Sequence, residues 1–136
     1  MTENKKSIKI LHSTLTSNMG GIEAFLCNLT KDIYELNKKT DVKIEFDFLM
    51  DGENPKIEKK FTDFGCKVYH TPKIMKGYSS FIKKILQKND YKFVHVHKNS
   101  AAEITLPKLV KKYSHAILVV HSHNTLPSYS SLATRL

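Results

Sequence analysis

Short segments with the apolar pattern of a β-strand alternate along this chain with segments whose apolar residues repeat at helical spacing. The strand pattern occurs at residues 8–11, 42–50, 66–70, 93–97 and 116–121, and the helical pattern at residues 22–36, 56–64, 78–87 and 101–113. Strands separated by helices of these lengths form βαβ units with parallel strands and right-handed crossovers. The sequence therefore predicts an α/β, Rossmann-like, doubly wound sheet with strand order 3-2-1-4-5. Ligands bind such sheets at the carboxyl ends of the strands.

The totals of the chain set limits on its class. Its 136 residues form one domain at most, with 40% apolar and 26% charged residues as in ordinary globular proteins. The first residues are polar and basic and do not resemble a secretory signal, and the longest purely apolar run, 116–120, cannot span a bilayer. Cys27 and Cys66 lack the spacing of metal ligands and are expected to be buried thiols. We expect a cytoplasmic protein.

The formal net charge is +9, and most of it comes from lysine-rich segments spread along the chain. Nucleic acid is not the expected partner, because Arg135 is the single arginine and no nucleic-acid-binding motif is present. Two interpretations stay open. The lysines form solvated faces, or they attract an anionic membrane surface or a phosphate-rich ligand.

A polar loop at residues 13–19, followed by Gly20 and Gly21, joins the first strand to the first helix. Unpaired N–H groups at a helix start attract anions, and glycine lets a phosphate or sugar approach the backbone closely. Neither the dinucleotide fingerprint nor the P-loop is present. The alternative is a purely structural helix start, in which Gly20 is the N-cap and Glu23 completes a capping box.

Five of the seven histidines lie where predicted strands end: His12, His95, His97, His121 and His123. The predicted strand order brings all five to one edge of the sheet. Three interpretations fit: histidines that line a cleft and donate to hydroxyls and phosphates, buried hydrogen-bonded histidines, or metal ligands. No carboxylate or cysteine accompanies them, so we favour the cleft and expect no metal.

Four motifs occur in one order: GGIEAF at 20–25, FDFL at 46–49, YKFVHVH at 91–97 and HSHNT at 121–125. Together they resemble the N-terminal domain of the family-4 glycosyltransferases of GT-B architecture. The similarity is strongest to bacterial enzymes that build capsular polysaccharide, exopolysaccharide or O-antigen. It covers residues 6 to 125, nearly the whole chain.

The resemblance implies two Rossmann-like domains across a cleft, the N-terminal one binding the acceptor and the C-terminal one most of the nucleotide-sugar donor. It implies that Gly20 and Gly21 approach the donor's phosphates and sugar. It also implies that His123, or alternatively His121, is the catalytic histidine near the transferred sugar. In this family, transfer retains the anomeric configuration and needs neither a metal nor another cofactor. The remaining residues expected to line the cleft are His12, His97, Asn99 and Asn124.

The chain departs from that family in lacking its C-terminal domain with paired glutamates spaced E-x7-E. We therefore expect residues 1–136 to be a truncated, acceptor-side part of a hexosyltransferase, inactive alone and completed by the missing domain or a partner subunit. Its expected acceptor is a lipid-linked or oligosaccharide glycan, and its expected location is peripheral, at the inner membrane face. The alternative is a non-catalytic module of a split transferase that binds a glycolipid or recruits a partner.

Overall fold

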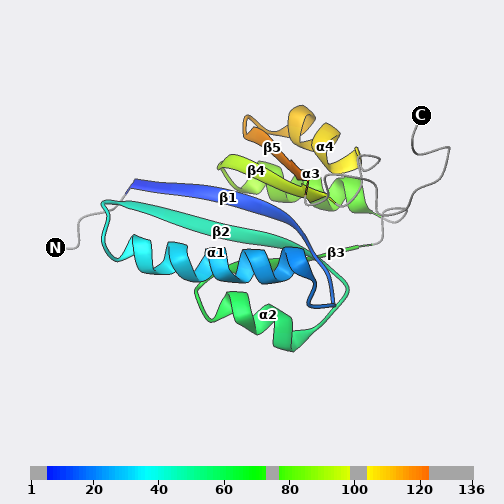
Figure 1. The fold of residues 1–136 in the computed structure, drawn as a ribbon. Helices are drawn as coiled ribbons and strands as arrows, with labels where there is room; N and C mark the ends of the chain where they lie inside the picture. The colour runs from blue at the N-terminus through cyan, green and yellow to red at the C-terminus, as the bar shows by residue number, and fades with distance from the viewer. Residues whose placement is uncertain (1–5, 73–76, 99–103, 123–136) are drawn as a thin grey trace.

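The computed structural model describes residues 6–72, 77–98 and 104–122, which form one parallel sheet flanked by helices (Figure 1). The strand order is β3-β2-β1-β4-β5, and every neighbouring pair is parallel. The predicted fold class and strand order are thereby confirmed. The elements along the chain are β1 (Lys6–Leu15), α1 (Gly21–Asn37), β2 (Val42–Asp51), α2 (Pro55–Thr62), β3 (Lys67–Thr71), α3 (Tyr78–Lys88), β4 (Tyr91–Lys98), α4 (Thr105–Tyr113) and β5 (Ile117–Ser122).

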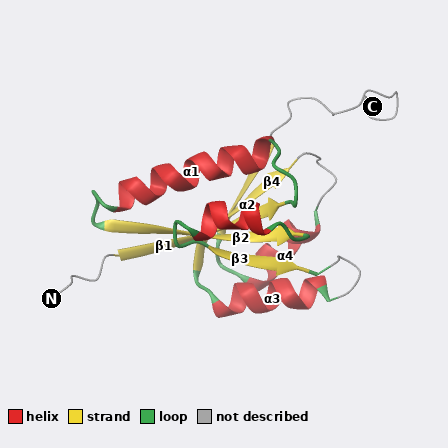
Figure 2. Ribbon diagram, turned by 90° about the horizontal axis from the view of Figure 1, so that it is seen from below, coloured by secondary structure: helices red, strands yellow, loops and turns green. Residues whose placement is uncertain are grey.

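The helices form two layers, one on each face of the sheet. Helices α1 and α2 lie below β1 and β2 in Figure 1, and Figure 2 shows α3 across the strands from α1. Leu26 of α1 and Phe61 of α2 pack on Phe48 and its neighbours in β2. On the other face, α3 and α4 pack on Leu11, Leu49 and Val94. Strands β1, β2 and β3 thus carry residues into two different cores, whereas β4 and β5 contribute only to the core on the α3 and α4 side.

Element boundaries differ from the sequence prediction mainly in the strands. Strand β1 extends four residues beyond 11 to Leu15, so His12 lies within the strand and not after it. Strand β5 runs from Ile117 to Ser122 and contains His121, in agreement with the predicted range 116–121. Helix α4 begins at Thr105, which places Pro107 in the first turn, where a backbone N–H has no partner inside the helix.

A β-bulge shifts the register between β1 and β4. Lys9 pairs with Tyr91, but the next residue, Ile10, pairs with Phe93. Lys92 is therefore the extra residue of β4. From this point to Ser13 the pairing is regular, and it sets which side chains meet further along the two strands.

The α1 side of β4 and β5 is less covered than the rest of the sheet. In β5, Ile117 and Val119 on this side are 52% and 38% exposed, while Leu118 on the other side packs against the core and Val120 is 51% exposed. Phe25, predicted on the apolar face of α1, is 39% exposed. This less covered face is the one that carries the histidines.

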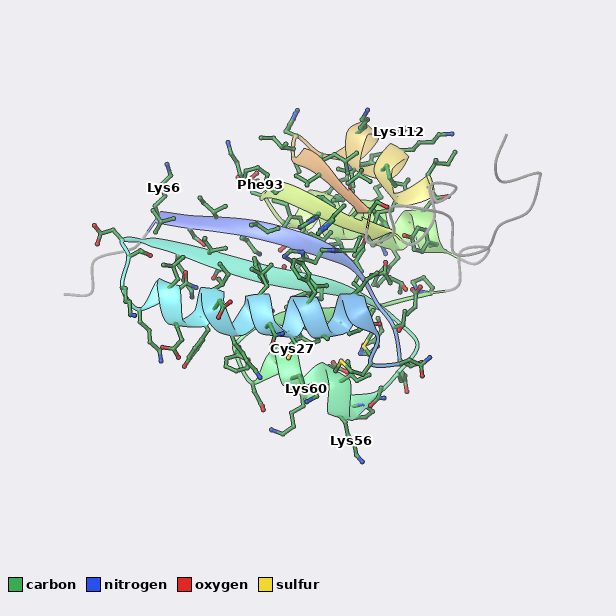
Figure 3. The ribbon with its side chains drawn as sticks, viewed as in Figure 1. Lys6, Cys27, Lys56, Lys60, Phe93 and Lys112 are labelled. Atoms are coloured by element: carbon green, nitrogen blue, oxygen red, sulfur yellow. The ribbon has the colours of Figure 1, made fainter. Side chains whose placement is uncertain are left out.

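The lysines lie on both sides of the molecule. Lys56 and Lys60 project from α2 below the sheet, and Lys112 projects from α4 above it (Figure 3). The apolar side of α3 packs into the core through Ile82, Ile85 and Leu86, so the exposed side of this helix is polar and carries its lysines. Within the described parts of the chain, no helix is both long and apolar enough to cross a bilayer.

Candidate functional site

Four histidines lie on one face of the sheet as two cross-strand pairs. His12 of β1 is directly opposite His95 of β4, and His97 of β4 is directly opposite His121 of β5. Residues i and i+2 of a strand share a face, so His95 and His97 point to the same side. The alternating Val94 and Val96, which precede His95 and His97, point into the core on the other side. The sheet register therefore assembles the cluster.

The rings of this histidine cluster are in close contact. The Nδ1 atom of His12 lies 3.1 Å from the Nε2 atom of His97, a hydrogen bond in which one nitrogen donates and the other accepts. The ring centroids of His95 and His97 are 4.0 Å apart. His121 stacks on His95 with an interplanar angle of 12° and centroids 5.4 Å apart.

Burial divides the cluster into an inner and an outer part. His12 and His97 are 1% and 5% exposed, whereas His95 and His121 are half-buried. Phe46 and Phe48 pack against the His12 ring at centroid distances of 4.3 and 5.2 Å. This burial, together with nearby His95, lowers the pKa of His12 to about 3, so His12 is neutral at physiological pH. Its Nε2 atom finds no hydrogen-bond partner among the described residues.

Phe25 connects the histidine cluster to the glycine-containing start of α1. Its ring lies edge-on to His121 at 5.6 Å and tilted against His97 at 6.1 Å. Gly20 is the N-cap of α1 and Gly21 its first residue, one helical turn before Phe25. The start of α1 and the histidines of β4 and β5 are thus neighbours at the carboxyl side of the sheet.

The capping box considered from the sequence is not formed. The N–H of Gly20 donates to the Asn18 carbonyl at 3.0 Å instead of to Glu23. The buried Glu23 carboxylate accepts from the backbone N–H and the hydroxyl of Thr16, at 3.2 and 2.5 Å. Glu23 therefore ties the loop after β1 to the helix and does not cap it.

The backbone conformation at positions 20 and 21 does not require glycine. Neither has a positive φ, unlike Gly52, Gly65 and Gly77. Apart from its own helix backbone and chain neighbours, a Cβ added at Gly21 would meet no atom of the described residues within 4 Å, so the space at this position is open. The absence of a side chain there leaves the first turn of α1 accessible to a ligand.

Three of the predicted site residues, Asn99, His123 and Asn124, lie outside the described residues. Of the others, His12 and His97 are buried, His121 is half-buried, and Gly20 and Gly21 are exposed. The sequence groups His95 with the other histidines but gives it no site role. The i, i+2 spacing of His95 and His97 was the sequence feature that could have indicated this role. Only the β1–β4 register reveals that His95 faces His12.

A second polar cluster, at the opposite end of the sheet, was not predicted. The Tyr91 hydroxyl donates to the buried Asp47 carboxylate at 2.6 Å, and the Lys9 ammonium lies 3.8 Å from the same oxygen. Lys9 also donates to the side-chain oxygen of Asn89 at 2.8 Å. Burial and the Asp47 charge raise the pKa of Tyr91, so its hydroxyl remains a donor.

A groove of about 600 Å³ lies at the same end, between the second half of α1, β2 and the segment before β3, and Asp47 and Cys66 contribute to its lining. Burial raises the pKa of the Cys66 thiol to about 12, which makes it unreactive.

Neither a protein-family model nor a curated protein matches this sequence. What is established is the architecture: a five-stranded parallel α/β sheet of Rossmann-like order, with a histidine cluster beside the start of α1.

Proposed function

We propose that this chain is the acceptor-side part of a retaining glycosyltransferase that moves a hexose from a nucleotide-sugar donor to a lipid-linked or oligosaccharide acceptor. The observation that carries the proposal is the proximity of the open helix start at Gly21 to His97 and His121, through Phe25. Both lie at the carboxyl side of β1 and β4, where the strand order reverses and α/β sheets bind ligands.

Each part of this site has a chemical use in sugar transfer. The N–H groups at the start of α1 suit the phosphates of a nucleotide sugar. Imidazole nitrogens donate to and accept from sugar hydroxyls, and the half-exposed Phe25 ring offers an apolar surface to a pyranose. In this proposal His123, or alternatively His121, acts near the transferred sugar.

A single Rossmann-like unit supplies one wall of a transfer site. The departing nucleotide diphosphate needs preorganised donors around its developing charge. Orienting donor against acceptor contributes up to roughly 7–11 kcal/mol in well-ordered active sites, and one wall cannot fix both. We therefore propose that the chain binds ligands but requires a second domain or a partner subunit for turnover.

The second candidate is a non-catalytic module that holds a glycolipid or recruits a catalytic partner. The exposed Ile117 and Val119 beside the histidine cluster favour it, because an apolar strip next to a polar site suits an amphipathic ligand or a protein partner. Supplying the C-terminal half of a family-4 glycosyltransferase separates the two. Transfer by the pair favours the enzyme, and binding without transfer favours the module.

Calorimetric titration of the purified chain with nucleotide sugars and with extracted lipid-linked glycans tests the site. Gly21→Leu fills the open space and should weaken nucleotide-sugar binding at least tenfold. Gly21→Ala and the exposed α1 control Asn28→Leu should bind as the unmodified chain does. Equal binding by all of these variants, or no binding of any nucleotide sugar or glycan, would contradict the proposal.

A further inference from the structure

The histidine cluster contains three imidazoles whose ring nitrogens can converge on a single point. One nitrogen from each of His12, His95 and His97 can be chosen so that all three lie within 4.8 Å of one another. The three come from two hydrogen-bonded strands, and their positions are fixed by the β1–β4 register. A rigid sheet is a suitable platform for ligands that must be held in fixed geometry.

We propose that His12, His95 and His97 form a binding site for a transition-metal dication of the zinc type. Zinc–nitrogen bonds of about 2.0–2.1 Å in a tetrahedral site place neighbouring ligand nitrogens roughly 3.3 Å apart. The His12 and His97 nitrogens are already 3.1 Å apart. His95 is half-buried, so its ring is the one with room to adjust its approach.

The His12 atom that faces His97 is Nδ1, so an ion held between these two rings would replace the hydrogen bond that joins them. His12 is 1% exposed, and Phe46 and Phe48 pack against its ring, so this ligand is held in place by its surroundings.

The donor set determines which metal fits. Three neutral imidazoles suit Zn²⁺, Co²⁺, Ni²⁺ or Cu²⁺, whereas Mg²⁺ and Ca²⁺ require oxygen ligands. Three protein ligands also leave one tetrahedral position for water or an oxygen of an anion. This inference goes beyond the proposed function, since the resemblance implies transfer without a metal.

Metal titration of the chelator-treated chain, with no nucleotide or sugar present, tests the site. Co²⁺ should bind at one equivalent with the intense visible absorption of a tetrahedral site, Zn²⁺ should displace it, and excess Mg²⁺ should not. Zn²⁺ should also raise the melting temperature. Because outer-shell changes alone weaken metal binding by about 10–100-fold, the ligand substitution His95→Ala should weaken it at least tenfold.

Matched variants separate this site from adventitious binding. His115→Ala removes an exposed histidine before β5 and should leave Co²⁺ affinity unchanged. His121→Ala should weaken it less than threefold, because His121 lies outside the three-ligand set.

Circular dichroism of the metal-free His95→Ala and His12→Asn proteins checks folding, and His95→Ala alone decides the test if His12→Asn does not fold. Unchanged Co²⁺ binding by His95→Ala, or equal loss in His95→Ala and His121→Ala, would overturn the proposal. Because no sugar ligand is used, failure here leaves the proposed function untouched.

Discussion

His12 lies opposite His95 in the sheet register, yet its Nδ1 atom hydrogen-bonds to His97, two residues further along β4. This diagonal contact requires one nitrogen to carry a proton and the other to accept it. It therefore persists only while at least one of the two rings is neutral. The buried His12 ring is that neutral member.

Stability should consequently fall as the solution becomes acidic. The pKa of His12 is about 3 in the folded protein and about 6.5 in the unfolded chain, so the unfolded state binds more protons between these values. Stability from this group is present above pH 6.5 and lost as pH falls toward 3, by about 2 kcal/mol between pH 7 and pH 5. Urea unfolding at several pH values measures it.

The variant His12→Phe should show a shallower dependence of unfolding free energy on pH, whereas His115→Ala should keep the original one. The comparison uses the change of unfolding free energy with pH, so the constant cost of packing a larger ring does not affect the result. Identical slopes for His12→Phe and the unmodified chain would show that His12 is not the titrating group.

The glycines should respond to alanine in opposite ways. Gly21→Ala places its methyl group in open space at a normal helical conformation and should leave stability unchanged or raise it by up to about 1 kcal/mol. Gly65→Ala also meets no atom, but its φ of +81° should cost about 1–2 kcal/mol. Thermal unfolding of the pair measures both effects, and a Gly21→Ala protein as destabilised as Gly65→Ala would contradict the open helix start.

Removing the Tyr91 hydroxyl should destabilise the fold. In Tyr91→Phe the buried Asp47 carboxylate loses the donor at 2.6 Å and keeps only the Lys9 ammonium at 3.8 Å. The expected loss is about 1–3 kcal/mol in chemical denaturation. Tyr34→Phe, at a 40% exposed position, is the control and should change stability by less than about 0.5 kcal/mol.

The exposed lysines of α3 should bind anionic vesicles by electrostatics alone, because the apolar side of that helix is in the core. Each lysine near an anionic surface contributes about 1 kcal/mol, so Lys84→Ser with Lys88→Ser should lower vesicle affinity on the order of thirtyfold. Co-sedimentation at low and high salt measures it, with Lys56→Ser plus Lys60→Ser on α2 as the charge-matched control. Equal sedimentation with neutral and anionic vesicles at low salt would rule out the surface.

The chain alone should transfer no sugar. Purified protein supplied with a panel of nucleotide sugars and membrane extract should give no turnover above that of Gly21→Trp, because one wall of a site cannot orient donor and acceptor together. The amount of radiolabelled product formed measures the turnover directly. Clear transfer, abolished by His123→Ala, would instead mean that an oligomer completes the site.

The sheet could be predicted from the sequence because each strand and helix has its own local periodicity, and parallel strands joined by helices allow few topologies. The gathering of histidines at one edge followed from the same order. The burial of these histidines could not be predicted from the strand order, because it depends on the extension of β1 to Leu15 and on Phe46 and Phe48 packing around His12. The sequence also left open a capping box at Glu23, which does not form because Thr16 competes with the Gly20 N–H for the same carboxylate.

The bulge at Lys92 has a consequence for the whole histidine face. If Lys92 paired regularly with Ile10 and did not bulge, His12 would meet Val94 instead of His95. Every later side chain of β4 would change sides, so that His95 and His97 would point into the apolar packing of α3 and α4 and the valines would replace them beside α1. The bulge at one residue of one strand thus decides which face of the molecule carries its chemistry.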